Sequence, residues 1–573
     1  MKKLLIITAF LPYMAFCHSL PWLWPQQGFA PGTLIITEIM ADPSPPVGLP
    51  AYEYVELHNP SALVVSLSGW TFTLNSSTVV IPDVTLQPGE YIIICGTTAA
   101  GMLNGYGKVV GVKSFPSLLD NGAVIVLRDN AGVFIHGVGY TPSWHSSSLK
   151  EEGGWSLEMI DLEYPFYAED NWTSSISRKG GTPCSVNSVL RSNPDRISPQ
   201  VTNVFPDDSV TLTISFSESI PNFQEVAVGY NHDGLDFSGI AASDPLLQKF
   251  TVTLGTPLER GRAYSYMVPA SVTDFSSNGV SSRLFSFALT ETIMPGDLMF
   301  NEILFDPWPG GHDFVEIVNV SDHCVDASSL MFVSRNTSAG TLSAAYSVSP
   351  EPRCIMPGGY YVVTTGREQV ISQYPSCSEE NLYEVTAMPS LPDDRSAVLL
   401  YTTWLEVVDS MAYDKSMHFS LLSGTEGISL EKYEPAANSG IRTNWHSASS
   451  TSGWATPGSV NSVFTEVVPD GSEISLSGRR ITPDSDGVED MLVILFRSPS
   501  AENVLRVTLF DESGYPVRTL ADNLYTGYEA SFTWDGTDDN GSLLPTGIYV
   551  VLITAFDSTG NKAVWKKAVA VLR

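Results

Sequence analysis

Short runs rich in β-branched and aromatic residues, in which apolar side chains either alternate with polar ones or follow one another, recur along the chain. Between residues 33 and 140 the runs are TLIITEIM, YEYVELHN, SGWTFTL, GEYIIIC, GAVIVLRD and GVFIHGVGY, and residues that favour turns separate them. Runs of this length and period predict β-strands. The pattern therefore predicts an all-β chain built from β-sandwiches, with few long helices.

One long stretch of this pattern occurs twice. ITEIMADPSPPVGLPAYEYVELHNPS at Ile36–Ser61 and NEILFDPWPGGHDFVEIVNVS at Asn301–Ser321 both read as strand, Asp-Pro loop, strand and Asn-led turn. The later motifs follow in the same order, ending in GTPCSVNSV in the first copy and ATPGSVNSV in the second. Such an internal repeat predicts two related sandwiches, at residues 31–190 and 296–463.

Both copies resemble bacterial, extracellular lamin tail domains. The shared motifs are an N-E-I strand, an E-x-x-E-L/I-x-N strand, a P-G-x-Y strand, an S-L-E strand and a closing T-P-G-x-x-N. The departures are Thr37 in place of Asn, Cys184 in place of Gly, and the missing Gly-Trp of the second copy. The resemblance implies an immunoglobulin-like sandwich without catalysis.

Residues 195–290 resemble a bacterial immunoglobulin-like module. The motifs are I-x-F-S-E at Ile214–Glu218, P-L-x-x-G-x-x-Y at Pro257–Tyr264, V-T-D-x-x-x-N at Val272–Asn278 and F-x-F at Phe285–Phe287. The resemblance implies a further sandwich between the two copies.

Residues 474–573 resemble the C-terminal immunoglobulin-like module of flagellar-hook-capping proteins and of many secreted bacterial proteins. The signature W-D-G-x-D-x-x-G-x-x-x-P-x-G-x-Y begins at Trp534. By analogy, such a module can serve as the sorting signal of type IX secretion, which makes the secretion machinery a candidate partner. The resemblances together imply tandem immunoglobulin-like β-sandwiches.

The charge of the chain narrows the choice of partners. Its 573 residues include 30 Lys and Arg against 62 Asp and Glu, which gives a formal net charge of −32. This charge repels phosphate backbones, so no nucleic-acid partner is expected.

The first residues have the form of an export signal. Lys2 and Lys3 precede an apolar run from Leu4 to Phe16, and we interpret residues 1–17 as a signal peptide. The alternative is a lipoprotein whose Cys17 is lipidated, although Phe16 stands where such signals usually have Gly or Ala. No later run is long enough to span a bilayer. We therefore expect a protein secreted or held at the cell surface.

Cysteines after the signal are odd in number and form no C-x-x-C pair, which disfavours zinc and thioredoxin-type chemistry. Cys324 can pair with Cys354 or Cys377, and Cys95 can pair with Cys184, if the compartment is oxidising. Buried free thiols are the alternative.

One loop near the C-terminus has the composition of a calcium site. ITPDSDGVED places Asp484, Asp486 and Asp490 around a Gly, and Ca²⁺ prefers several oxygen ligands from a sharply turning loop. The alternative is an Asx turn that opens a strand. The other acidic cluster, Asp535, Asp538, Asp539 and Asn540, is typical of a hairpin turn, and a shared calcium site is the alternative.

Carboxylates also recur in the opening strands of the two copies, and glycosidases use such pairs at about 5–9 Å. Residues three apart in a strand face opposite sides, so Glu53 and Glu56 do not point together, whereas Glu38 and Glu56 can meet across neighbouring strands. We interpret them as structural carboxylates and predict no catalytic residue. The corresponding positions in the second copy are Glu302, Asp313 and Glu316.

Other signatures of catalysis are missing from the sequence. H-E-x-x-H, G-x-S-x-G, Walker and dinucleotide-binding motifs do not occur, and His312 in GGHDFVE has close acidic neighbours. Tryptophans can stack on sugars, but at strand positions they more often pack in cores. The tryptophans in question are Trp70, Trp155, Trp172, Trp308, Trp445 and Trp534.

We therefore predict an exported, non-catalytic structural or adhesive protein that presents loops to an unknown protein or polysaccharide. An accessory carbohydrate-binding protein is one alternative. An exported hydrolase or nuclease-type enzyme is another, because bacterial lamin tail domains often accompany such enzymes, although no segment of catalytic-domain size is left over. The two copies differ most in the loops PSPPVGLPAY and PWPGGH, where divergent binding is expected.

Overall fold

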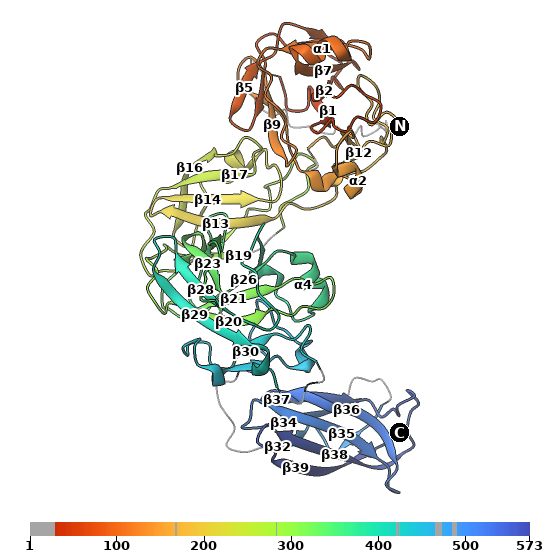
Figure 1. The fold of residues 1–573 in the computed structure, drawn as a ribbon, viewed down its shortest axis with the longest axis vertical. Helices are drawn as coiled ribbons and strands as arrows, with labels where there is room; N and C mark the ends of the chain where they lie inside the picture. Colours follow the sequence, from red (N-terminus) through yellow and green to blue (C-terminus); the bar gives the residue numbers. More distant parts are fainter. Residues whose placement is uncertain are drawn as a thin grey trace, which may run out of the picture.

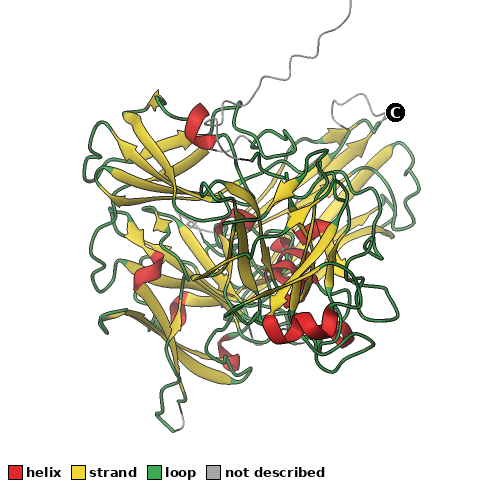
Figure 2. Cartoon of the chain, turned by 90° about the horizontal axis from the view of Figure 1, so that it is seen from above, coloured by secondary structure: helices red, strands yellow, loops and turns green. Residues whose placement is uncertain are grey.

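The structure is a computed structural model that describes residues 29–572 except 167–168, 282–283, 338, 420–421, 423, 465–472 and 484–489. The signal segment with Cys17 lies outside these residues. Strands dominate throughout, which confirms the all-β prediction (Figure 2). The chain runs as an elongated string of four β modules (Figure 1). We call residues 29–189 the first module, 201–287 the second, 298–463 the third and 473–571 the fourth.

The first module packs a six-stranded sheet against a four-stranded sheet, and a two-stranded ribbon closes one end. The six-stranded sheet has the order β12 (Trp172–Ser174), β11 (Leu157–Met159), β1 (Ile35–Met40), β2 (Tyr54–His58), β7 (Tyr91–Gly96) and β8 (Val109–Val112). The four-stranded sheet has the order β10 (Phe134–Tyr140), β9 (Ala123–Arg128), β4 (Thr71–Leu74) and β5 (Ser77–Val80), and the ribbon pairs β3 (Val65–Ser66) with β6 (Thr85–Leu86).

The third module repeats this strand order throughout. Its six-stranded sheet has the order β31 (Trp445–Ser447), β30 (Leu430–Lys432), β20 (Leu298–Leu304), β21 (Phe314–Asn319), β26 (Tyr360–Thr364) and β27 (Leu382–Glu384). Its smaller sheet has the order β29 (Val407–Asp414), β28 (Arg395–Thr402), β23 (Leu330–Arg335) and β24 (Tyr346–Ser347), and β22 (Val325–Asp326) pairs with β25 (Cys354–Ile355).

The central strands of these two modules are buried on both faces. Every residue of β1 and β2 is buried, as is every residue of β21. One face of each larger sheet packs on the smaller sheet, and the opposite, outer face is covered by a short helix and by the last residues of the module. The helices α1 (Thr97–Leu103) and α4 (Arg367–Gln373) lead into the parallel edge strands β8 and β27.

The second and fourth modules are smaller sandwiches. The second pairs the sheet β13 (Val201–Asp208), β14 (Thr211–Phe216), β17 (Lys249–Leu254), β16 (Leu235–Ala242) and β15 (Asn231–His232) with β18 (Tyr264–Met267) and β19 (Leu284–Phe287). The fourth pairs β32 (Glu473–Leu476), β34 (Leu492–Arg497) and β37 (Glu529–Trp534) with β33 (Arg480–Ile481), β39 (Lys562–Val571), β38 (Gly547–Asp557), β35 (Asn503–Phe510) and β36 (Pro516–Thr526).

The remaining helices, α2 (Ser148–Glu151) and α3 (Phe223–Val226), are single turns. None of the described helices combines the length and the apolar content needed to traverse a lipid bilayer.

The five described cysteines are free thiols. Cys324 directly precedes β22 and lies close to Cys354 of β25, and the Cys324 thiol, followed by burial, raises the pKa of Cys354. The choice between disulfides and buried thiols stays a prediction.

Each junction between modules contains direct contacts. At the first, Phe134 packs with Leu246 in a small apolar cluster. At the second, Asn203 Nδ2 donates to the Pro352 carbonyl at 2.8 Å. At the third, the Ser450 hydroxyl donates to the Tyr525 carbonyl at 2.8 Å.

Candidate functional site

Three glutamates form a row across the outer face of the larger sheet in the first module. Glu38 on β1 lies opposite Glu56 on β2 and, on its other side, opposite Glu158 on β11. Neighbouring residues Ile39 and Val55 belong to the core between the two sheets, so strand alternation places the glutamates on the other face. All three side chains are fully buried. The sequence predicted the meeting of Glu38 and Glu56 but did not include Glu158.

The last residues of the module, 182–189, hold this row. The Thr182 amide donates to Glu38 Oε1 at 2.8 Å, and its hydroxyl donates to Glu158 Oε1 at 2.8 Å. The Cys184 amide donates to Glu56 Oε2 at 2.6 Å. We call residues 182–189 the first closing segment, because it lies over the sheet and supplies the donors that the buried carboxyl groups need.

The third module builds the same row. Glu302 lies opposite Glu316 and Glu431 on the neighbouring strands, and all three are fully buried. The Thr456 amide donates to Glu302 Oε1 at 2.9 Å, and the Gly458 amide donates to Glu316 Oε2 at 2.6 Å. Residues 456–463 therefore form the second closing segment.

A β-bulge in the first strand of each module adds one more donor to the row. The register shifts between Ile36 and Glu38 in β1, and it shifts at the equivalent place in β20. The extra residue turns toward the glutamates. Thr37 Oγ1 donates to Glu56 Oε1 at 2.7 Å, and Asn301 Nδ2 donates to the equivalent Glu316 Oε1 at 2.6 Å. The departure of Thr37 from the usual Asn therefore keeps the hydrogen bond.

Burial sets the protonation of these rows. It raises the pKa of Glu38 to about 7, with a smaller contribution from the charge of Glu158, and it raises the pKa of Glu316 to about 8. Burial also raises the pKa values of Glu56 and Glu302. Shielded from solvent and hydrogen-bonded within their own module, these carboxyl groups tie the strands to the closing segment, and they offer no open face to a substrate.

Three other predicted positions lie outside the rows. Glu53 accepts hydrogen bonds from the Ser117 hydroxyl at 2.7 Å and from the Leu118 amide at 2.9 Å, and so holds a loop. Burial raises the pKa of Asp313, which corresponds to Glu53, to about 7. His312 Nδ1 lies 3.0 Å from the Thr365 hydroxyl.

The calcium loop predicted in the fourth module falls mostly outside the described residues. Asp484 and Asp486 are not described, and Asp490 is half-buried. Calcium binding by this loop therefore stays a prediction.

The carboxylates of the neighbouring W-D-G signature stabilise turns. Asp538 Oδ1 accepts from the amides of Asn540 at 2.9 Å and Ser542 at 2.8 Å. Asp535 Oδ1 accepts from the Thr537 amide at 3.1 Å, and Asp539 Oδ1 accepts from a strand amide at 2.9 Å. These contacts agree with the hairpin interpretation.

All six tryptophans considered for sugar stacking are buried or half-buried. Trp70 is 1% exposed, and Trp308 stacks on Tyr374 with ring centroids 5.3 Å apart. Trp404, which sequence analysis did not select, is 49% exposed on the turn between β28 and β29. The other predicted positions are buried at Trp172, Trp445 and Trp534 and half-buried at Trp155.

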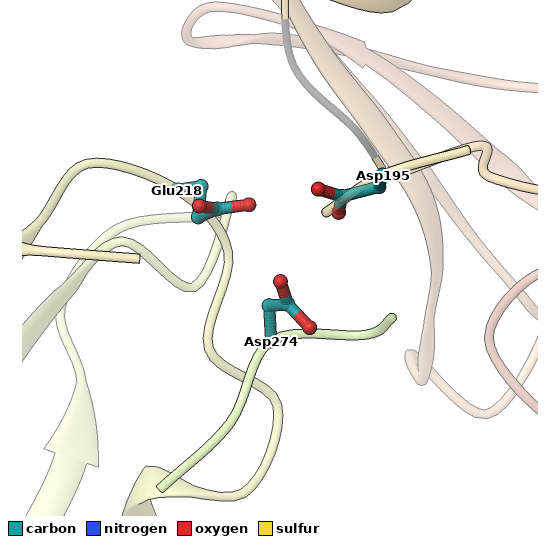
Figure 3. Close-up of side chains that lie close together, drawn as sticks. All are labelled: Asp195, Glu218 and Asp274. Carbon is teal, nitrogen blue, oxygen red and sulfur yellow. The ribbon is translucent and has the colours of Figure 1, made fainter. Parts of the chain in front are cut away.

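A different group of carboxylates lies where the first and second modules meet. Asp195 belongs to the linker of residues 190–200, Glu218 follows β14, and Asp274 lies in the loop after β18 (Figure 3). One oxygen of each lies within 4.8 Å of the others, and the side chains are 6%, 7% and 4% exposed. Glu218 and Asp274 stand in motifs quoted above, but their meeting with the linker depends on tertiary structure.

The three carboxylates differ in what holds them. Asp274 accepts from the Asn278 amide at 2.8 Å and from its side chain at 2.9 Å. Asp195 accepts from the Ile197 amide at 3.1 Å. Within the described part of the chain, the Glu218 carboxylate accepts no hydrogen bond, and it points toward the other two (Figure 3).

Negative charge at this cluster is not balanced by a neighbouring cation. Burial, followed by the charges of Asp195 and Asp274, raises the pKa of Glu218 to about 8. Burial also raises the pKa of Asp274. No described Lys or Arg forms an ion pair with any of the three. Oxygen ligands of this kind suit a hard cation.

Comparison with curated proteins finds no match. Among solved structures, the periplasmic chaperone SfaE matches at 9% identity and a TM-score of 0.14, over 17% of this chain and 56% of that one. Latent PorU from Porphyromonas gingivalis matches at 10% identity and a TM-score of 0.15, over 95% of this chain and 34% of that one. The S-layer protein rSbsC(31-844) matches at 11% identity and a TM-score of 0.15, over 66% and 54%.

These scores are too low to carry a functional argument, and the chain spans about a third to just over half of those three proteins. Comparison with models of protein families identifies two domains. Residues 27–142 match the Lamin Tail Domain, and residues 480–559 match the FlgD Ig-like domain. The chain therefore contains a lamin tail domain near its start and an FlgD-type immunoglobulin-like domain near its end, as the sequence motifs indicated.

Proposed function

We propose that the chain is an exported, non-catalytic structural or adhesive protein that presents binding loops on a string of β-sandwiches. The observation that carries this proposal is the structural role of the paired glutamates. In both rows the carboxyl groups are fully buried and accept hydrogen bonds from residues of their own module, as at Glu38 and Glu302. Residues that resemble a catalytic pair thus have a structural role, and the variable loops are left for function.

The third module is best explained as a second lamin tail domain. It shares with the first module the strand order, the bulge, the glutamate row and the closing segment. We propose sandwich boundaries at residues 31–190, 195–290, 296–463 and 474–573. The last of these would dock on the secretion machinery, an inference that rests on analogy.

Binding differences between the two copies are expected in the loop that follows the first strand. Residues 43–52 form a long loop in the first module, and residues 307–312 form a short one in the third. A shallow pocket beside the long loop is lined by Pro43, Tyr52 and Glu53.

A loop exchange tests the proposal. In the variant, PWPGG replaces residues 43–48 of the full chain, so that Leu49 and Tyr52 of the apolar cluster around Tyr54 stay in place, and flow cytometry measures binding of the labelled protein to the cells that produce it. We expect wild-type protein to bind and the variant to lose binding with unchanged thermal unfolding, because the exchange keeps this cluster and the buried glutamate row. Equal binding by both proteins would contradict the loop assignment. Turnover of a phosphoester or polysaccharide that disappears in Glu38→Gln would contradict the non-catalytic role.

Trp404 supports a second candidate, an accessory carbohydrate-binding protein. It is exposed beside Leu405, which is 74% exposed on the same turn. Exposed aromatic rings suit stacking on sugars. Binding to a glycan array that is lost in Trp404→Ala and kept in Trp70→Phe would favour this candidate.

A further inference from the structure

We propose that Asp195, Glu218 and Asp274 form a Ca²⁺ site that fastens the first module to the second. This site is separate from the calcium loop predicted in the fourth module, and it does not depend on the adhesive role.

The geometry of the ligands favours Ca²⁺. The three residues offer only oxygen atoms, which suits Ca²⁺ and Mg²⁺ better than softer metals. Oxygens within 4.8 Å of one another need only small side-chain rotations to reach a common Ca²⁺ at about 2.4 Å. Mg²⁺ needs a nearly ideal octahedron of ligands with shorter bonds of about 2.0–2.1 Å. Three carboxylates at this spacing do not define such an octahedron.

Glu218 points to a ligand independently of the cluster itself. Its side chain is 7% exposed and accepts no hydrogen bond from the described residues. A buried carboxylate without a donor is costly unless a cation or proton joins it. Its oxygens face those of Asp195 and Asp274 (Figure 3), so a cation bound there would be shared by all three.

The ligands come from both sides of the junction. The Asn193 amide donates to Asp161 Oδ2 at 2.6 Å, which fixes the linker to the first module two residues before Asp195. Glu218 and Asp274 belong to loops of the second module. An ion bound by all three therefore ties the linker to the second module.

An aromatic contact lies directly beside the site. Phe275, which follows Asp274, stacks on Phe166 of the first module with ring centroids 3.7 Å apart. The ion would thus reinforce an existing apolar contact. Without it, mutual repulsion of the carboxylates opposes the close approach of the linker.

Arg196 provides a direct readout. It is exposed in the linker next to Asp195, so trypsin can cut after it once the linker moves away from the second module. We expect Ca²⁺ to slow cleavage after Arg196 in the full chain by about tenfold at a concentration ten times the Kd, because only the bound form is protected. Peptide mass spectrometry over time measures this rate.

Three variants define the test. Glu218→Gln and Asp195→Asn should abolish the Ca²⁺ effect, and calorimetric titration should show one Ca²⁺ fewer per chain. Glu225→Gln, the matched control on the exposed face of α3, should behave as wild type. Asp195→Asn keeps the test valid if Glu218→Gln fails to fold, since Asp195 lies outside the strands. Unchanged cleavage in wild type with millimolar Ca²⁺, equal protection by Mg²⁺, or Ca²⁺ protection that persists in Asp195→Asn would overturn the proposal.

Discussion

Glu38 and Glu218 are both buried glutamates, but their surroundings differ. Glu38 Oε1 accepts hydrogen bonds from the Tyr54 hydroxyl at 2.7 Å, from the Ser156 hydroxyl at 2.6 Å and from a closing-segment amide. Glu218 accepts none among the described residues. The first arrangement fixes a fold without any ligand, whereas the second gains from a cation.

The raised pKa of Glu38 predicts a dependence of stability on pH. The carboxyl pKa is 4.5 in its ordinary state and about 7 in the folded chain, so between these values the folded state keeps a proton that the unfolded state has released. This contribution to stability is fully present below about pH 4.5 and is lost as pH rises through 7.

Glu38→Gln tests this dependence. Glu38 Oε2 has no hydrogen-bond partner, so an amide nitrogen fits there while Oε1 keeps its donors. We expect the variant to gain on the order of 2–3 kcal/mol over wild type between pH 5 and 8, because Gln has no proton to lose. Hydrogen exchange of β1 peptides, corrected for intrinsic rates, measures this difference in stability at each pH. The same pH dependence in Glu38→Gln and wild type would refute this explanation, and Glu225→Gln is the matched control.

At the scale of elements, the closing segments complete the sandwiches of the first and third modules. Asn187 Nδ2 donates to the carbonyls of Thr37 at 2.9 Å and Met159 at 2.8 Å, and Asn461 donates to the equivalent carbonyls of the third module. Each segment therefore joins strands that are far apart in sequence.

Asn187→Ala tests the role of the segment. The substitution leaves two buried carbonyls without these donors, and we expect the first module to lose about 2–4 kcal/mol. Hydrogen exchange should rise in residues 182–189 and in β11, while the third module stays unchanged. Asn130→Ala, in an exposed turn, is the control. Protection of the closing segment equal to wild type would show that the glutamates alone hold it.

Sequence patterns predicted these elements to different extents. Alternation and turn residues predicted the strands, and the alignment of the copies paired Glu38 with Glu302. Glu158 and the closing segment were not recognised as parts of the row, because their contact depends on which distant strands become neighbours. Asp195 was missed for the same reason, because it comes close to Glu218 and Asp274 only when the second module folds beside the linker.

The backbone conformation at Cys184 is a further constraint that the sequence motif did not reveal. Cys184 has a φ of +56°, and Gly458 at the equivalent position has +78°. This left-handed conformation explains why Gly is usual there, since other residues pay a conformational cost. The sequence showed the departure at Cys184 but not its reason.

At the scale of the whole molecule, the modules are joined by different chemistries. The first junction combines an aromatic stack with the carboxylate cluster. The second adds the ion pair of Lys249 with Glu351 at 2.6 Å, and the third stacks Phe419 on Tyr525 with centroids 4.7 Å apart. The modules are thus joined in series by a few direct contacts at each junction (Figure 1).

The central prediction is that the protein is exported. The most direct test is to fractionate the producing cells and to identify both chain termini by mass spectrometry. We predict that the chain occurs in the medium or on the surface, begins near residue 18, and is cut by protease added to intact cells. A chain that begins at Met1 and is protected inside the cell would contradict the account.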